Sequence, residues 1–168
     1  GKTKVAAEAY VLGRENGISL RLATVFGMAP RMRLDLLVND FVHRAVHDRA
    51  VVLFESHFKR NYIHVRDVSR AFLHCMSNFE NMKSEIYNVG LSSANLSKLE
   101  LCQEIKKIIP NLNIIELETE KDPDQRNYIV SNKKLEGTGF LPSYTLSDGI
   151  KELIKGYTML KNQSFGNF

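Results

Sequence analysis

The stretch Arg60-Asn61-Tyr62-Ile63-His64-Val65-Arg66-Asp67-Val68 decides the fold. Its first six residues alternate between the two sides of an extended chain, which predicts a β-strand. Ile63 and Val65 would share one face, and Arg60 and His64 the other. We therefore expect one face of this strand to pack against the core and the opposite face to contact a ligand.

A helix is expected directly after this strand. Asp67 is a residue type that favours the N-cap position, and Ala71 and Cys75 follow at helical spacing. The short apolar run from Glu85 to Val89 predicts another strand. Residues 60–90 thus indicate a strand, a helix and a strand in succession.

The residues before position 60 repeat this alternation of helix and strand. Lys2 to Arg14 predicts a helix with one apolar stripe. Ile18 to Phe26 has the apolar, β-rich composition of a buried parallel strand. A second helix is expected over residues 34–48 and a short strand over 51–54. This order favours α/β packing.

Beyond residue 90 the pattern predicts two helices and a strand. Ser97-Lys98-Leu99-Glu100 has the capping-box pattern and opens a helix that Pro110 ends. The apolar stripe expected for this helix comprises Leu99, Cys102, Ile105 and Ile109. A strand is expected over 113–118 and a polar, irregular segment over 119–126. The stripe of the last helix comprises Ile150, Leu153, Ile154 and Tyr157.

The composition narrows the classes of function. The chain has 168 residues, 43% hydrophobic and 25% charged, with 23 basic against 19 acidic side chains and a net charge of +4. Its basic residues are scattered, which argues against nucleic-acid binding and favours small anions at chosen positions. The apolar runs are far shorter than the ~20 residues of a membrane span. We expect a soluble protein that does not bind membranes.

The two cysteines and one pair of histidines indicate whether disulfide bonds or a metal site are expected. Cys75 and Cys102 stand apart, which argues against a disulfide framework or a zinc site and favours a reducing cytoplasm. His43 and His47 are four residues apart, but the glutamate of a His-Glu-x-x-His motif is absent. We expect no metal site.

Three stretches together resemble the C-terminal half of an extended short-chain dehydrogenase/reductase, of the nucleotide-sugar epimerase and dehydratase group. Residues 1–8 are similar to the helix that carries the family's Tyr-x-x-x-Lys motif. Residues 21–27 are similar to the strand and turn beside the nicotinamide, and residues 60–68 to the family's Arg-Asp/Asn-aromatic-Ile-His-Val-x-Asp-Val block. Tyr87-Asn88-Val89-Gly90 also matches. The likeness spans nearly the whole chain.

The resemblance implies an α/β fold in two parts. Residues 1–26 and 61–90 would form the end of a Rossmann-type, doubly wound parallel sheet, and residues 27–60 and 91–168 a smaller α/β substrate-binding lobe. No Gly-x-x-Gly-x-x-Gly turn occurs in the sequence. The resemblance therefore implies that the pyrophosphate-binding half, and the tyrosine of the motif, lie upstream of Gly1.

The activity implied is transient hydride transfer between a nucleoside-diphosphate sugar and bound NAD or NADP, with a tyrosine as acid and base. The outcome would be epimerisation or 4,6-dehydration. A nucleotide-sugar 4-reductase remains an alternative, as does a module that binds a nucleotide sugar or a protein without chemistry. A nucleic-acid binder is suggested only by the pI of about 9.1.

Lys4 is the implied catalytic residue. It matches the lysine that holds the ribose hydroxyls of the nicotinamide nucleotide and favours the phenolate of the neighbouring tyrosine. By spacing alone Lys4 would be a solvated helix residue. Thr24 and Val25 match positions that pass the carboxamide of the cofactor, mainly through their backbone.

Arg60 and Arg126 are implied to hold the diphosphate of the substrate, because a guanidinium can donate two hydrogen bonds to phosphate oxygens. Judged without the resemblance, Arg60 would be an exposed arginine at a strand edge. The residues around Arg126 match the family less well. The acidic residue usual for the family shortly after Arg126 is absent at Ser131.

Four further residues match substrate-binding positions. Asn39 matches an asparagine that meets the diphosphate, and Val52 and Phe54 match positions that flank the base. Asn88 matches a position near the sugar nucleotide, although it also suits a strand end. The family's habit of pairing through the helix of the tyrosine and lysine implies a homodimer.

Overall fold

The computed structural model describes residues 1–117 and 126–159. Most of the polar segment expected over 119–126 therefore lies outside the described residues. Among the described helices, none has both the length and the apolar character needed to cross a membrane.

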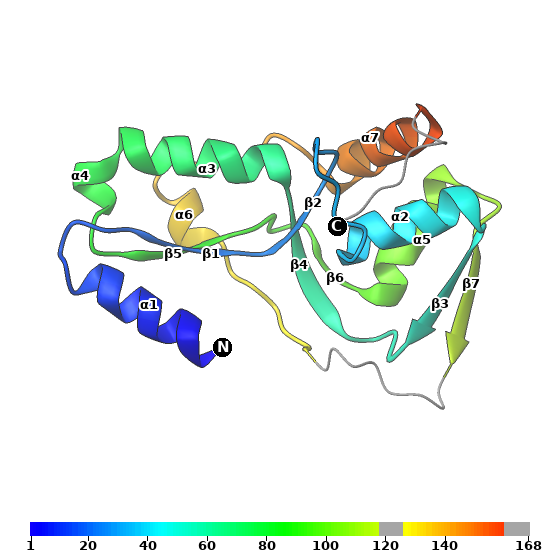
Figure 1. The fold of residues 1–168 in the computed structure, drawn as a ribbon, viewed down its shortest axis with the longest axis horizontal. Helices are drawn as coiled ribbons and strands as arrows, with labels where there is room; N and C mark the ends of the chain where they lie inside the picture. Colours follow the sequence, from blue (N-terminus) through cyan, green and yellow to red (C-terminus); the bar gives the residue numbers. More distant parts are fainter. Residues whose placement is uncertain (118–125, 160–168) are drawn as a thin grey trace.

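Helices and strands alternate along the chain (Figure 1). In order they are α1 (Lys2–Leu12), β1 (Ser19–Leu22), β2 (Thr24–Phe26), α2 (Leu37–His47), β3 (Ala50–Phe54), β4 (Lys59–His64), α3 (Val65–Ser77), α4 (Phe79–Met82), β5 (Ile86–Val89), β6 (Asn95–Ser97), α5 (Lys98–Ile108), β7 (Asn113–Leu117), α6 (Lys133–Glu136) and α7 (Leu146–Met159).

The strands form three small sheets dominated by parallel pairs. β1 pairs with β5, β2 with β4 and β3 with β7, all parallel, while β6 joins β4 antiparallel. Each parallel pair is linked through helices, as parallel strands require. The expected α/β class is confirmed.

The strand expected over residues 18–26 is divided at Ala23. Its first part, β1, pairs with β5, and its second part, β2, pairs with β4. The Ala23 N–H still donates to the carbonyl of Val89 in β5, at 2.9 Å. One apolar run thus contributes a strand to each of two sheets. The break at Ala23 is set by the distant strands β4 and β5, so the sequence near Ala23 does not reveal it.

The prediction that one face of the deciding strand is open to a ligand was wrong in part. β4 is the central strand of its sheet, and its residues from Arg60 to His64 are buried on both faces. Tyr62 and Ile63, on opposite faces, are both fully buried. Val65 does not continue the strand but begins α3.

Asp67 is not the N-cap of α3. The helix starts two residues earlier, and His64 caps it because its ring Nδ1 accepts a hydrogen bond from the Arg66 N–H at 3.2 Å. Asp67 is fully buried and accepts from the N–H groups of Ser143 and Tyr144 at 2.9 Å each, and from the guanidinium of Arg70. It joins α3 to the segment that leads into α7.

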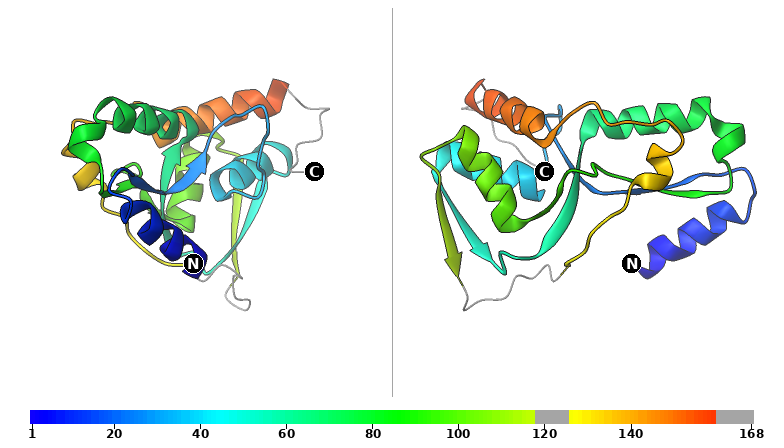
Figure 2. Two further views of the ribbon diagram at one scale, coloured as in Figure 1. Left: turned by 60° about the vertical axis from the view of Figure 1, so that its left-hand side comes forward. Right: turned by 180° about the vertical axis from the view of Figure 1, so that it is seen from behind.

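Two clusters of apolar side chains form the core. The larger lies among α2, β3, α5 and α7 and contains Val42, Leu101 and Leu153. The smaller packs α3 and β5 together and also takes in Leu135 and Phe140. The two clusters lie at opposite ends of the long axis of the molecule (Figures 1 and 2).

The predicted apolar stripes of α7, α5 and α1 agree to different degrees with the residues that are buried. Ile150, Leu153 and Tyr157 of α7 are fully buried, as expected. In α5 the predicted Cys102 and Ile105 are buried, whereas the predicted Leu99 and Ile109 are only partly buried against the core. Lys98 and Leu101 complete the buried stripe. α1 buries none of its residues. The apolar residues of α1 therefore do not serve a core within the described chain.

Candidate functional site

Three of the expected site residues meet at one hollow of about 220 Å³, which we call the cationic hollow. Thr24 comes from β2, Arg60 from β4, and Arg126 from the segment that returns after residue 125. The complete lining comprises Thr24, Asp35, Leu36, Leu37, Arg60, Lys98 and Arg126. The lining thus has three basic side chains and one carboxylate, an excess of positive charge of the kind that attracts anions.

Arg60 reaches the cationic hollow from a buried position. Its side chain is only 4% exposed, one of its guanidinium nitrogens donates to the carbonyl of Lys59 at 3.0 Å, and Tyr128 lies with its ring centre 5.4 Å away. These contacts orient the guanidinium before any ligand arrives. Arg126 is exposed, so the hollow is bordered by one arginine in the core and one at the surface.

A second hollow of about 270 Å³, the β3 hollow, adjoins the first. Val52 and Phe54 line it, so the two residues expected to flank a base are brought together. The complete lining comprises Leu37, Asp40, Phe41, Arg44, Val52, Leu53, Phe54 and Lys98. Leu37 and Lys98 line both hollows, which places the two spaces side by side.

Asn39 and Val25 line a third hollow of about 240 Å³ beside the loop that follows β2. Asn39 is buried, its Oδ1 accepts from the Gly27 N–H at 3.1 Å, and its Nδ2 donates to the Arg33 carbonyl at 3.0 Å. The asparagine therefore holds the loop against α2. Asn39 does not line the cationic hollow.

Lys4 lies apart from these residues. It is exposed on α1 and lines a hollow of about 560 Å³ between α1 and β1. Glu8 holds the helix there through Arg21 and Ser19, and the hydrogen bond from Arg21 lowers the pKa of Glu8. Arg60 is not part of the lining of this hollow, and Lys4 is not part of the lining of the cationic hollow.

Asn88 has a partner within the chain. Its Nδ2 donates to the carbonyl of Ser131 at 3.1 Å, which ties β5 to the segment after Arg126. It lines neither the cationic nor the β3 hollow. Of the expected substrate residues, the structure thus groups Arg60 and Arg126 in one hollow and Val52 and Phe54 in the next.

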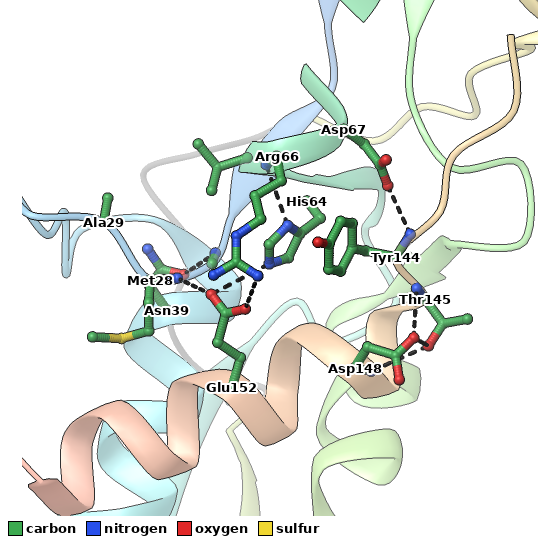
Figure 3. Close-up of polar contacts among 12 residues, drawn as sticks. Met28, Ala29, Asn39, His64, Arg66, Asp67, Tyr144, Thr145, Asp148 and Glu152 are labelled. Atoms are coloured by element: carbon green, nitrogen blue, oxygen red, sulfur yellow. Dashed lines mark hydrogen bonds and ion pairs between the residues drawn. The ribbon is translucent and has the colours of Figure 1, made fainter. Parts of the chain in front are cut away.

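A polar network around the buried His64 supports the loop after β2 (Figure 3). Glu152 of α7 accepts from the Met28 N–H at 3.1 Å, pairs with Arg66 at 3.1 Å, and lies 3.6 Å from His64 Nε2. Burial lowers the pKa of His64, while Glu152 opposes that shift. Gly27 has a φ of +121°, and a Cβ there would lie 2.7 Å from His64 Nε2. The turn therefore requires glycine.

Two residues of these networks escaped the sequence interpretation. Glu152 is 88 residues from His64, and no local pattern links them. Lys98 did leave a signal, because it precedes Leu101, Cys102 and Ile105 by three, four and seven residues. That spacing places Lys98 on the buried face of α5.

His43 and His47 pack against each other with ring centres 4.4 Å apart, and His43 also packs edge-on against Tyr157. Burial lowers the pKa of His43. Within residues 1–117 and 126–159, no set of three or more His, Cys, Asp or Glu side chains is placed to hold a metal ion. Cys75 and Cys102 are both free thiols and both buried.

Known proteins resemble this chain in sequence and fold. The dTDP-D-glucose 4,6-dehydratase of Homo sapiens is 24% identical over an alignment that covers 92% of this chain and 47% of that protein. The chain spans about half the length of the curated relatives it matches.

Solved structures confirm the Rossmann-type α/β fold. UDP-glucose 4-epimerase from Thermotoga maritima, solved with UDP-glucose, has a TM-score of 0.77 and 23% identity over 96% of this chain and 52% of that one. RMD from Pseudomonas aeruginosa, complexed with NADPH, has a TM-score of 0.76 and 17% identity over 92% of this chain and 54% of that one.

The family comparison covers the region that contains the deciding strand. The model of the NAD dependent epimerase/dehydratase family matches residues 1–90, which is more than half of the 168 residues. The chain therefore belongs to the NAD dependent epimerase/dehydratase family.

Proposed function

We propose that this chain provides the substrate-binding part of an NAD(P)-dependent enzyme that epimerises or 4,6-dehydrates a nucleoside-diphosphate sugar. The proposal includes the division into residues 1–26 with 61–90, toward the cofactor, and residues 27–60 with 91–168, toward the substrate. Two of the proteins named above are, by name, a dTDP-D-glucose 4,6-dehydratase and a UDP-glucose 4-epimerase.

The observation that carries this proposal is the pair of adjoining hollows. The cationic hollow offers Arg60 and Arg126, which suit a diphosphate. The β3 hollow offers the aromatic ring of Phe54 and the half-exposed Val52, which suit the flat face of a base. A nucleoside diphosphate has these two parts in the same order, so one ligand would occupy both hollows.

Thr24 connects the cationic hollow to the proposed cofactor side. It lines the hollow with Arg60 and starts β2, whose next residue is Val25. We assign the backbone of these two residues to the carboxamide side of NAD or NADP. Bound there, NAD or NADP would supply a transient acceptor for hydride from the sugar.

Lys4 suits the role of positioning a proton donor. Its ammonium group is exposed, and no described residue forms an ion pair or a hydrogen bond with it. A cation held beside a tyrosine favours the phenolate form of that tyrosine. We therefore assign Lys4 to the ribose of the cofactor and to the acid–base tyrosine of the family motif.

A homodimer through α1 and a cytoplasmic location complete the proposal. Val5, Tyr10 and Val11 of α1 are exposed, and so are the small residues Ala6 and Ala9. A helix with an exposed apolar surface suits pairing with a second copy. Free, buried cysteines suit a reducing compartment.

Calorimetry with dTDP-glucose and UDP-glucose tests the binding part of the proposal. We expect Arg60→Met to weaken binding about tenfold or more, because it removes a charge-assisted contact with phosphate. Arg126→Met, at an exposed position, should weaken binding in the same direction without affecting the fold. Arg14→Met on α1 makes the same change in charge and should bind as the wild type does. Equal binding by all three variants would refute the assignment.

Product analysis separates the alternative reactions. With NAD and a bound sugar nucleotide, NMR would show inversion at C4 for an epimerase and a 4-keto-6-deoxy sugar for a dehydratase. Net oxidation of NAD(P)H would identify a 4-reductase. Because the tyrosine of the motif is expected upstream of Gly1, these measurements use a protein that includes that upstream half. In that protein, tight binding of the sugar nucleotide without turnover would instead identify a binding module.

A further inference from the structure

Residues 126–132, which we call the return segment, pass along the strands without being one of them. The segment forms neither helix nor strand, and its residues from Arg126 to Ile129 are exposed. Regular strand pairing and deep apolar burial therefore do not set its position. That position depends instead on individual hydrogen bonds with the strands that the segment passes.

The main chain of Lys59, the first residue of β4, joins the return segment to Arg60. The Lys59 N–H donates to Oδ1 of Asn127 at 2.9 Å, and the Lys59 carbonyl accepts from the N–H of Tyr128 at 3.2 Å. The same carbonyl accepts from the guanidinium of Arg60 at 3.0 Å. One residue of β4 thus anchors both the buried arginine and the two residues that follow Arg126.

Asn95, the first residue of β6, fastens the return segment again at Val130. The Asn95 Oδ1 accepts from the N–H of Val130 at 2.9 Å, and the Asn95 Nδ2 donates to the carbonyl of Val130 at 3.0 Å. The side-chain amide thereby reproduces the two hydrogen bonds that a pair of strand residues would exchange. Because both bonds go to one residue, they set the direction of the main chain as well as its distance from β6.

These bonds affect the cationic hollow because the return segment begins at Arg126. Arg126 and Arg60 are both part of the lining of that hollow, and the ring centre of Tyr128 lies 5.4 Å from the guanidinium carbon of Arg60. A ligand that has to order a loosely held segment loses affinity in doing so. Fastening the residues beside Arg126 in advance reduces that loss.

We propose that Asn95 and Asn127 are positioning residues for the diphosphate, which hold the return segment so that Arg126 stands in the cationic hollow with Arg60 before a ligand binds. The inference rests on the proposed function, in which the two arginines contact the diphosphate. It deepens that function by assigning the preorganisation of the site to two side chains that act through Arg126. Neither asparagine is part of the lining of the cationic hollow or of the β3 hollow.

A double-mutant cycle separates positioning from a general effect on structure. The paired change Asn95→Ala/Asn127→Ala is made in the wild type and in an Arg126→Met background. The probe is whichever of UDP, dTDP, ADP and GDP binds the wild-type chain most tightly in calorimetry. We expect the paired change to raise the Kd about fivefold in the wild type, because the ligand must then order the segment itself. In the Arg126→Met background it should raise the Kd by less than about twofold, because the arginine that it positions is already absent.

Asn78→Ala provides the matched control. The Asn78 Nδ2 donates to the carbonyl of His74 at 2.9 Å, so this variant also removes a side-chain bond to the main chain, but at the end of α3. It should bind the probe as the wild type does. Asn127→Ala alone is the second variant, because Asn127 is exposed and its loss should leave the fold intact. It should raise the Kd about threefold in the wild type and should have no such effect in the Arg126→Met background.

The outcomes separate this inference from the proposed function. If Arg126→Met weakens binding while the asparagine variants bind as the wild type does, the inference is wrong and the proposed function stands. A loss of equal size in both backgrounds would show that the asparagines do not act through Arg126, which also overturns the inference. If the wild type binds none of the four nucleotides, the inference and the proposed function fail together.

Discussion

The two ends of the molecule differ in how completely they bury their apolar side chains. At one end, α2, α5 and α7 enclose a core in which Val42, Leu101 and Leu153 are fully buried. At the other end, α1 buries no residue, and α3 leaves large apolar side chains exposed along one side. The exposed apolar residues of these two helices are Val5, Tyr10, Val11, Phe72, Leu73 and Met76.

The two ends are held together by different kinds of contact. The end with α7 is stabilised by apolar burial, which contributes about 25 cal/mol for each Å² removed from water. α1 is instead held to β1 by polar contacts, in which Glu8 accepts hydrogen bonds from Arg21 and Ser19. Such exposed ion pairs contribute little to stability. We therefore expect the free energy of unfolding to depend mainly on the α2, α5 and α7 end.

The largest effect is expected at the contact between the two ends. Asp67→Ala removes the carboxylate that accepts from Ser143, Tyr144 and Arg70, and leaves these donors without their acceptor. We expect a loss of about 3–5 kcal/mol in the free energy of unfolding, measured by urea denaturation. Asp67→Asn keeps one acceptor oxygen and should lose less. Equal stability of wild type and Asp67→Ala would show that this contact does not join the ends.

A matched pair of leucines tests the comparison directly. Leu153→Ala in α7 creates a cavity in the larger core and should cost about 2–5 kcal/mol. Leu73→Ala makes the same change on α3, where the leucine is 62% exposed, and should change stability by no more than about 0.5 kcal/mol. Urea denaturation of both variants measures the two values. Similar losses would mean that the leucine on α3 is covered when the protein is in solution.

The N-caps of α5 and α1 differ as well, and we expect a smaller effect on stability from this difference. Ser97 accepts from the Glu100 N–H at 3.1 Å and caps α5, whereas the Gly1 N-cap of α1 makes no side-chain bond. We expect Ser97→Ala to lower the free energy of unfolding by about 1 kcal/mol. Ser69→Ala, on the exposed surface of α3, is the control and should be nearly neutral. A shift in thermal midpoint for Ser69→Ala as large as that for Ser97→Ala would contradict this reasoning.

The smallest effect appears only on acidification. His64 is buried against Phe26, Tyr144, Arg66 and Glu152, and burial lowers its pKa in the folded state. The unfolded state therefore takes up the proton first. The stability that neutral His64 contributes is complete above about pH 6.5 and is lost as pH falls from there through the lower, folded-state pKa.

Thermal unfolding at pH 7.5 and pH 5.5 measures this loss. The decrease in midpoint between the two pH values should be smaller in His64→Gln than in the wild type, because the variant has no imidazole to protonate at that position. His57→Gln, at an exposed site, should retain the wild-type decrease. An unchanged decrease in His64→Gln would assign the acid sensitivity to other groups.

Local patterns predicted the elements of the fold well. The capping box at Ser97 did mark the start of α5, and the stripe of Ile150, Leu153 and Tyr157 did face the core. β3 and β7 occur almost where the apolar runs placed them. These features depend on residues within one or two turns of each other, so a single sequence contains the necessary information.

Features that depend on distant partners were missed. The division at Ala23 requires both β4 and β5, and the burial of both faces of β4 requires its neighbours β2 and β6. Asp67 is a residue type common at helix N-caps, but its carboxylate accepts hydrogen bonds from the N–H groups of Ser143 and Tyr144, more than 70 positions later. In the candidate site, the resemblance assigned Arg60 and Arg126 to one diphosphate, and both line the cationic hollow, while Lys98 was taken only as part of a cap.

The passage of one strand through two sheets at Ala23 has a mechanical consequence. Main-chain hydrogen bonds continue without a gap from the pairing with β5 to the pairing with β4, so the two sheets cannot rotate against each other unless some of these bonds break. Thr24, the first residue beyond the division, therefore belongs to a rigid wall of the cationic hollow. A ligand bound there would meet a preorganised surface and would lose little affinity in rearranging the backbone.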